Sequence, residues 1–282
     1  MAILVTGSAG FIGYHLSKKL LEEGHNVIGI DNLNSYYDVK LKKNRLNLLK
    51  KNNNFCFKKV DILDFNKLKN KLATYKFEYI IHLAAQAGVR VSLTNPRAYI
   101  DNNIEGFFNI LEIVKIKKPK HFLFASSSSV YGNSSDFPLT EKSKTDSPLS
   151  IYAATKKCNE IMAYTYSDLY NLNISALRFF TVYGEYGRPD MFFYKTMNLI
   201  SKNKKIEIFN YGKHERDFTY IDDLIDMIFK LMIKKKKQFE VYNLGSNSPI
   251  KLSKIIKILK KELNYNFKIT YKPLQIGDIK KT

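Results

Sequence analysis

The sequence predicts an α/β fold with a doubly wound parallel sheet and a smaller C-terminal lobe. Short apolar runs alternate with amphipathic stretches as far as about residue 180. Strands that alternate with helices in this way are joined by right-handed crossovers and form a parallel sheet. A turn with three glycines, Gly7, Gly10 and Gly13, follows the first apolar run and opens the first helix. After residue 180 the alternation loosens, so we expect two domains, 1–180 and 181–282.

The strands expected in the first domain are short apolar runs that end at turns. They cover residues 3–5, 27–30, 55–60, 79–83, 121–125 and 174–178. The helices between them have apolar residues at helical spacing and cover residues 11–23, 40–51, 63–75, 98–116 and 151–170. In the second domain we expect helices at 192–202 and 222–234 and a strand at 206–209. The lysine run at 234–237 is expected to form a solvated helix end.

Composition narrows the class of protein. The formal net charge is +20, but lysine is spread along the chain instead of forming one basic face. Scattered charge is a poor footprint for nucleic acid, so we expect no such partner. No run approaches the ~20 apolar residues of a membrane span, and two cysteines, Cys56 and Cys158, do not make a disulfide framework. The first expected strand begins at Ile3, which leaves no room for a signal peptide. We therefore expect a cytoplasmic protein without a membrane partner or a metal.

The glycine turn has the spacing and the context of a dinucleotide-phosphate loop, with an ordinary Gly-rich turn as the alternative. Gly7 allows a tight turn, Gly10 lets the backbone approach a pyrophosphate, and Gly13 lets the helix pack against the strand. Free N–H groups at the helix N-terminus would hold the pyrophosphate. Asp31 can accept from the adenosine ribose and would repel a 2′-phosphate, which favours NAD over NADP. Further cofactor contacts are expected from Phe11, Ile12, Asp61, Ile62, Leu83, Ala84 and Ala85.

Tyr152 and Lys156 are one helical turn apart, so their side chains share a helix face. A free phenol has a pKa near ~10, and a nearby positive charge favours its phenolate form. We therefore expect Tyr152 to be the general base and Lys156 to assist it and to hold the nicotinamide ribose. The helix follows the serine run 126–129 at the end of a strand, where open parallel sheets bind ligands. Ser127 is expected to relay the proton, with a plain serine-rich turn as the alternative.

Motifs over nearly the whole chain resemble the extended short-chain dehydrogenase/reductase superfamily, in its NAD-dependent nucleotide-sugar epimerase and dehydratase branch. The resemblance implies a Rossmann-type domain, a tightly held NAD, a nucleotide-diphosphate sugar in the cleft, and a homodimer built on helices that include the Tyr152 helix. It adds Asn32 and Asn102 to the expected cofactor site. The matching residues are Gly7–Gly13, Asp31, Asp61, 83–85, 102–103, 126–132, Tyr152 with Lys156, 178–184 and 216–223.

Within this branch the chain is most similar to UDP-glucuronate 4-epimerases, through residues 31–38, 86–90 and 180–191. Dehydratases of this branch carry an Asp–Glu pair where this chain has Ser128 and Ser129. UDP-glucose 4-epimerases generally carry Asn–Pro where it has Thr181 and Val182. Two alternatives stay open: an epimerase of another nucleotide sugar, such as UDP-glucose or a UDP-N-acetylhexosamine, and an inactive, truncated NAD-binding homologue.

The resemblance also implies the substrate contacts. Hydroxyl groups of Ser128, Ser129 and Thr181 can donate to a C6 carboxylate. Arg188 or Arg90 would add charge, because ionic hydrogen bonds are the stronger ones. Arg216 is expected to clamp the diphosphate, and Gln275 to approach the nucleotide ribose. In the family, tens of residues follow the string that ends at residue 278, so we expect a shortened substrate lobe.

Overall fold

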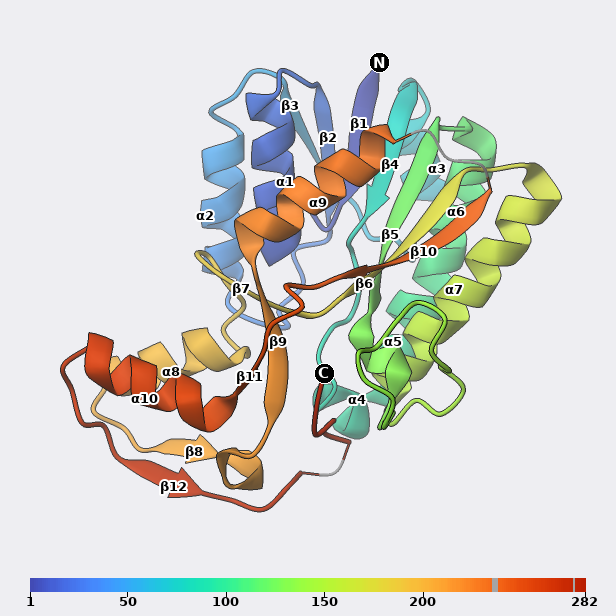
Figure 1. Cartoon of the computed structure of the whole chain (residues 1–282). Helices are drawn as coiled ribbons and strands as arrows, with labels where there is room; N and C mark the ends of the chain where they lie inside the picture. The colour runs from blue at the N-terminus through green and yellow to red at the C-terminus, as the bar shows by residue number, and fades with distance from the viewer. Residues whose placement is uncertain (235–237, 276) are drawn as a thin grey trace.

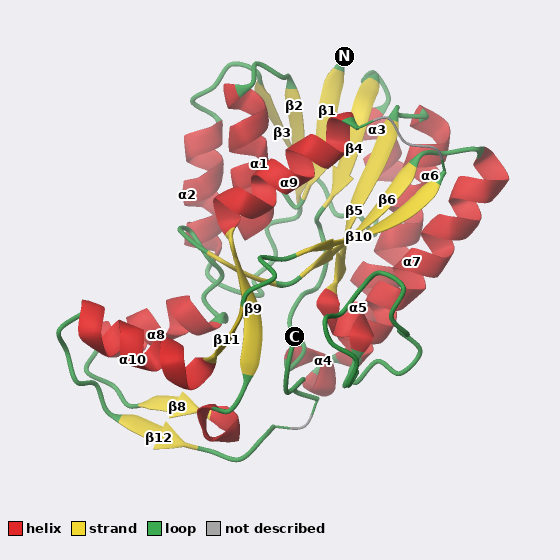
Figure 2. Cartoon of the chain, in the orientation of Figure 1, coloured by secondary structure: helices red, strands yellow, loops and turns green. Residues whose placement is uncertain are grey.

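A parallel sheet of seven strands forms the centre of the molecule (Figures 1 and 2). The computed structural model describes residues 1–234, 238–275 and 277–282, so residues 235–237 of the lysine run lie outside the described residues. The chain winds outwards from β1 in both directions, in the order β10-β6-β5-β4-β1-β2-β3, which confirms the predicted doubly wound fold. The strands are β1 (Ala2–Thr6), β2 (Val27–Asp31), β3 (Phe55–Lys59), β4 (Phe77–His82), β5 (His121–Ser127), β6 (Ile174–Phe179) and β10 (Phe239–Leu244).

Helices cover both faces of this sheet, and each face has its own apolar core. Leu4 and Val5 of β1 are both completely buried, one in each core. The strands are therefore continuous apolar runs instead of alternating ones. No helix among the described residues is both long and apolar enough to cross a membrane. One face carries α1 (Phe11–Glu22), α2 (Val39–Leu49) and α9 (Ile221–Ile233), and the other carries α3 (Phe65–Leu72), α6 (Gly106–Lys117) and α7 (Ile151–Tyr170).

The long helix expected at 98–116 is divided. A π-helical segment at Ile100–Glu105 separates α6 from the short helices α4 (Val91–Thr94) and α5 (Pro96–Tyr99). A Cβ added at Gly106 would lie 2.6 Å from Cδ1 of Ile62, so the glycine lets α6 pack closely. The wide π-helical turn carries Asn103, which is buried and binds both backbone groups of Gln86 and the Thr155 hydroxyl. Such turns are frequent at functional sites, and this one borders the cavity described below.

The smaller lobe, at the lower left of Figure 1, is a mixed α/β unit with a small core of its own. A three-stranded sheet has the order β11-β9-β7, and β8 pairs with β12 in parallel. A short 3₁₀ turn at Phe209–Gly212 follows β8, and another, at Ser128–Tyr131, follows β5 of the central sheet. The elements are β7 (Thr181–Tyr183), α8 (Phe192–Ser201), β8 (Ile206–Ile208), β9 (Glu215–Tyr220), β11 (Pro249–Lys251), α10 (Leu252–Glu262) and β12 (Ile269–Tyr271).

The expected division at residue 180 needs a correction, because the chain returns to the central sheet after the second lobe has begun. β10 pairs in parallel with β6, and α9 packs against α1. The return covers the edge of β6, whose backbone groups would otherwise lack partners. The smaller lobe therefore consists of two segments, 181–220 and 245–282.

Candidate active site

A cavity of about 940 Å³ lies at the carboxyl ends of the central strands and is lined from both the sheet and the smaller lobe. Ligands of open parallel sheets bind at this edge, where the strand order reverses. Two residues proposed from the sequence, Asp61 and Gln275, are not among the described residues that line it. The other proposed residues line it: Gly7, Gly10, Phe11, Ile12, Gly13, Asp31, Asn32, Ile62, Leu83, Ala84, Ala85, Arg90, Asn102, Ser127, Ser128, Ser129, Tyr152, Lys156, Thr181, Arg188 and Arg216.

The loop after β1 forms a cradle because its glycines carry no Cβ. Gly7 has a left-handed φ of 69°, and an added Cβ would lie 2.8 Å from the Ala84 nitrogen. At Gly13 an added Cβ would lie 2.1 Å from the Gly7 carbonyl oxygen. Gly10 is the N-cap of α1 and provides no side-chain cap. The first N–H groups of α1 therefore have no acceptor within the helix, and the cradle fits the pyrophosphate of a dinucleotide.

Asp31, at the end of β2, carries the only carboxylate that we proposed for the adenosine ribose. Its Oδ2 accepts from the N–H of Ala9 at 3.2 Å, and its Oδ1 accepts from the N–H of Leu33 at 2.8 Å. Burial raises the pKa of Asp31, and these hydrogen bonds act in the opposite direction. Asn32 donates to Oδ2 of Asp61 at 2.9 Å. Asp61 therefore positions Asn32, which lines the cavity, and does not line the cavity itself. A ribose diol fits the acceptor capacity that remains on Asp31.

A buried pair behind the cradle holds the small residues that line the cavity. Oγ1 of Thr6 accepts from the N–H groups of Leu83 and Ala84, both at 3.1 Å. The same hydroxyl lies 2.7 Å from Nδ1 of His82. Burial lowers the pKa of His82 to about 3, so the ring is neutral and Nδ1 can accept the threonine proton. This network fixes the end of β4 against the cofactor side of the cavity.

Helix α7 brings Lys156 to the end of β5. The helix begins after Ser150, whose side chain accepts from the N–H of Ala153 at 3.2 Å, a typical N-cap. Nζ of Lys156 donates to the carbonyl oxygen of Ala125 at 2.7 Å. Burial lowers the pKa of Lys156 to about 8, because removing the ammonium from water disfavours its charged form.

Tyr152 lies one turn earlier on the same helix face, and its ring packs edge-on against Tyr99 with centroids 6.1 Å apart. Burial raises the pKa of Tyr152, whereas a hydrogen bond with Ser127 and the positive charge of Arg188 lower it. The phenol, the serine hydroxyl and the guanidinium therefore meet at one place. The Tyr152 phenol can accept a proton from an alcohol when positive charge stabilises its phenolate form.

A buried ion pair holds α7 against the sheet. Arg178 of β6 donates from Nε and Nη2 to the two oxygens of Glu160, at 2.9 and 2.8 Å. Glu160 Oε1 also accepts from the Ser126 hydroxyl at 2.6 Å. Both charged side chains are 4% exposed. The pair fixes the helix that carries Tyr152 relative to the serine run at the end of β5.

Arg188 is held at the cavity by residues from the stretches 31–38, 86–90 and 180–191, to which the sequence analysis gave no individual role. Its Nε and Nη2 donate to the carboxylate of Asp190, at 3.1 and 2.5 Å. The Tyr36 hydroxyl, from the loop after β2, donates to the same carboxylate at 3.2 Å. A Cβ added at Gly88 would lie 2.7 Å from that hydroxyl, so three separate loops meet here. The guanidinium is thereby held where its charge acts on Tyr152.

The far end of the cavity is rich in cations. Nη2 of Arg90 lies 3.3 Å from Oδ2 of Asp278, and the ring of His214 lies 3.9 Å from the same oxygen. Arg216 of β9 donates to the carbonyl oxygens of Glu215 and Ile279. Two arginines beside a single carboxylate leave net positive charge, which is suited to a diphosphate.

Arg45 of α2 is a buried residue that sequence reasoning missed. It is completely buried, and its Nη1 donates to the carbonyl oxygen of Ala9 in the glycine loop at 2.9 Å. Its Nη2 donates to the carbonyl oxygens of Tyr186 and Gly187, at 2.5 and 3.3 Å. Arg45 thus ties the cofactor loop to the loop that carries Arg188. Its spacing from the buried Leu46 and Leu49 could have placed it on the inner face of α2.

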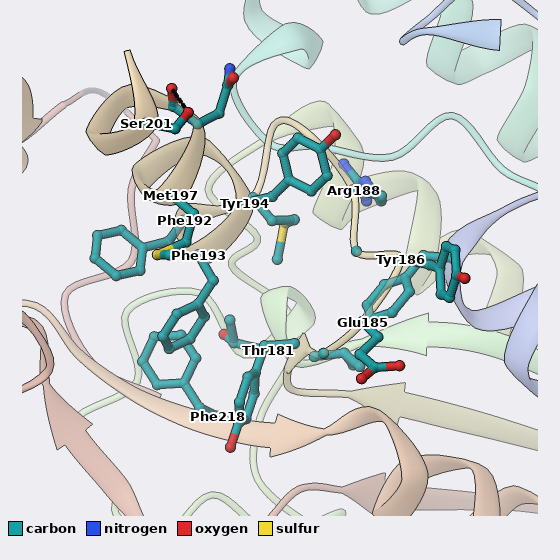
Figure 3. Close-up of a pocket in the computed structure, with 17 residues that line it drawn as sticks. Thr181, Glu185, Tyr186, Arg188, Phe192, Phe193, Tyr194, Met197, Ser201 and Phe218 are labelled. Carbon is teal, nitrogen blue, oxygen red and sulfur yellow. Dashed lines mark hydrogen bonds between the residues drawn. The ribbon is translucent and has the colours of Figure 1, made fainter. Parts of the chain in front are cut away.

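A second cavity of about 570 Å³ adjoins the first (Figure 3). The rings of Phe193 and Phe218 pack with centroids 5.3 Å apart on one wall, and Met197 lies beside them. Thr181 and Arg188 line both cavities.

The fold and the cavity together define an enzyme of the dinucleotide-binding α/β class, with a tyrosine and a lysine on one helix at the cofactor edge. The family model "NAD dependent epimerase/dehydratase family" matches residues 3–245. The chain belongs to this family, as the sequence motifs predicted.

Relatives and solved structures of this family cover almost all of the chain. The chain is 47% identical to a UDP-glucuronate 4-epimerase of Thermodesulfobacterium geofontis over 280 residues, which are 99% of this chain and 86% of that protein. It superimposes with a TM-score of 0.93 and 36% identity on a UDP-glucuronic acid 4-epimerase from Bacillus cereus in complex with UDP-glucuronic acid and NAD, over 100% of this chain and 89% of that chain. A UDP-glucose 4-epimerase of Thermotoga maritima with UDP-glucose has a TM-score of 0.90 and 32% identity, over 100% of this chain and 89% of that chain.

Proposed function

We propose that this chain catalyses NAD-dependent 4-epimerisation of a UDP-sugar and interconverts UDP-glucuronate and UDP-galacturonate. One observation carries the proposal: the glycine cradle, the group around Tyr152 and a cation-rich end all face a single cavity. A dinucleotide and a nucleotide sugar could therefore meet at Tyr152. Relatives named as UDP-glucuronate 4-epimerases, at 47% identity in one case, support this substrate.

In this proposal Tyr152 takes the proton from the C4 hydroxyl, and Ser127 relays it. The phenol needs positive charge to act near neutral pH, because burial raises its pKa. Arg188 provides such charge, and Lys156 lies one turn along the same face. Asp31 and the cradle hold the two ends of the adenosine diphosphate half of NAD. Hydride removal from C4, and its return to the opposite face of the 4-keto sugar, would be the chemistry that NAD supplies.

The substrate carboxylate poses a specific chemical problem. A carboxylate next to a 4-ketone belongs to a β-keto acid, which loses carbon dioxide when the breaking bond overlaps with the ketone. The enzyme must hold the carboxylate near the plane of that ketone. We propose that hydroxyl groups of Ser128, Ser129 and Thr181 hold it, with Arg188 as the charged partner. These residues line the same cavity as Tyr152.

The test is incubation of the purified protein with UDP-glucuronate, without added NAD, followed by proton NMR. Appearance of UDP-galacturonate supports the activity and a cofactor retained through purification. The Tyr152→Phe variant should retain NAD and lose conversion. If the folded, NAD-containing protein converts no UDP-glucuronate, the proposal is wrong. Conversion of UDP-glucose alone would favour the second candidate, a UDP-glucose 4-epimerase, which the similarity to the Thermotoga maritima enzyme raises.

We also propose a homodimer built on α6 and α7, in the cytoplasm, where the two free cysteines would stay reduced. These helices pack together and expose Phe108 on α6 and Ile161, Tyr164 and Leu169 on α7, to between 44% and 66%. An exposed apolar patch of this kind marks an interface. Light scattering after size exclusion should give twice the chain mass for the native protein and a monomer for Ile161→Glu. The control Tyr271→Glu, at an exposed residue of β12, should leave the mass unchanged.

A further inference from the structure

His214 lines the cation-rich end of the cavity and has a buried ring nitrogen without a hydrogen-bond partner among the described residues. The residue lies just before β9, is 5% exposed and lines the cavity. Its backbone carbonyl accepts from the N–H of Leu252 at 2.8 Å, which fixes its position, and its ring makes a hydrogen bond to the backbone of Phe209. Nε2 is buried and has no hydrogen-bond partner among the described residues. Buried polar atoms are rarely left this way without a reason.

The charged groups around this ring come from three parts of the chain. Arg216 lies on β9, Arg90 precedes α4, and Asp278 lies near the end of the chain. Burial lowers the pKa of His214, and the two arginines lower it further, while Asp278 acts in the opposite direction. Without a ligand the ring is therefore neutral at pH 7. The atom facing the carboxylate, Nε2 at 3.9 Å from Oδ2 of Asp278, can take up a proton.

We infer that His214 is a proton-linked third cation of the diphosphate subsite, neutral when the subsite is empty and protonated at Nε2 when a nucleotide diphosphate occupies it. The inference rests on the proposed function, because the ligand is the diphosphate of a UDP-sugar. A diphosphate diester carries two negative charges. These charges cancel the repulsion from Arg90 and Arg216, so the protonated ring becomes favourable. The proton is held at Nε2 beside the Asp278 carboxylate, and the diphosphate stabilises it through its charge.

Two measurable consequences follow from linkage. Binding of the UDP-sugar takes up a proton from the buffer, approaching one per site in the pH range where the empty form is neutral and the occupied form is charged. In that range the affinity falls as the pH rises, by up to about tenfold per pH unit. The range begins above the lowered pKa of His214 in the free protein.

The experiment is titration calorimetry of the NAD-containing Tyr152→Phe variant with UDP-glucuronate, in buffers of low and high ionisation enthalpy, from about pH 6 to about pH 8. Turnover is blocked in this background, and the diester diphosphate does not itself titrate in this range. His214→Gln places a neutral amide at the same position. It should bind UDP-glucuronate with up to one proton less taken up per site, and with an affinity that depends less steeply on pH; any uptake that remains is assigned to Lys156, whose pKa is lowered to about 8. The matched control His25→Gln, far from the cavity, should keep the uptake.

The outcomes separate this inference from the proposed function. Proton uptake that is reduced in His214→Gln and kept in His25→Gln supports it. Binding without uptake, or uptake that is as large in His214→Gln as with His214 present, overturns it and leaves the epimerase proposal intact if the wild-type protein converts UDP-glucuronate. No binding together with no conversion by the wild type overturns both. If His214→Gln unfolds, His214→Asn is measured in the same way, and its result has the same meaning.

Discussion

Glu160→Leu should destabilise the protein far more than a typical surface substitution does. Glu160 and Arg178 form a buried pair whose side chains are each 4% exposed. The substitution leaves Nε and Nη2 of Arg178, which now donate at 2.9 and 2.8 Å, without an acceptor. Breaking a buried ion pair from one side costs about 3–5 kcal/mol. This is a large part of the about 5–15 kcal/mol by which folded proteins are stable.

The double variant Glu160→Leu with Arg178→Met tests the cause. Apolar replacement of both partners of a buried pair is often neutral or stabilising, so the double variant should recover most of the loss. A surface control is the pair of Lys18 and Glu22, whose side chains are 57% and 59% exposed and 3.7 Å apart. Glu22→Leu should change the free energy of unfolding by less than about 1 kcal/mol.

Urea unfolding followed by circular dichroism measures each free energy, and an unchanged slope shows that the unfolded state is comparable. Because α7 also carries Tyr152, the single variant should lower kcat for epimerisation, and the double variant should restore part of it. A cost of Glu160→Leu below about 1 kcal/mol would refute the reasoning, since that is the value of a solvated pair. A double variant no more stable than Glu160→Leu would refute it as well.

Three further predictions follow from the site. Gly13→Ala should abolish NAD retention, because its Cβ would lie 2.1 Å from the carbonyl oxygen of Gly7. The control Gly24→Ala, whose Cβ would have no atom within 4 Å, should retain NAD. Absorbance of the released cofactor after denaturation measures NAD in both variants. Thr181→Val or Ser128→Ala should raise the share of decarboxylated product, measured by NMR, and unchanged ratios in both would exclude their role. His82, whose pKa is lowered to about 3, is neutral when folded and takes up a proton when unfolded below about pH 6.5. The free energy of unfolding should therefore fall as the pH drops below that value, by up to about 1.4 kcal/mol per pH unit, with a shallower slope in His82→Gln.

The sequence by itself determined the parts of the protein that depend on local chemistry. Gly7, Gly10 and Gly13 predicted the cradle because the backbone there excludes a Cβ, and the structure has contacts as short as 2.1 Å at the added atom. Apolar runs predicted the strands because both faces of the sheet are covered. The spacing of Tyr152 and Lys156 placed them on one face of α7, because helical geometry is the same in every context.

Tertiary structure alone decided the features that join distant segments. β10 belongs to the central sheet because it pairs with the edge of β6, some sixty residues earlier in the chain. The local sequence pattern of β10 does not indicate which strand it pairs with. Three backbone carbonyl groups from two loops surround the guanidinium of Arg45, a residue that the sequence analysis did not single out. The charged groups that act on the His214 ring include Arg90 and Asp278, which lie far from it along the chain. Local sequence sets which backbone conformations are possible, whereas burial and electrostatic neighbours exist only after the chain has folded.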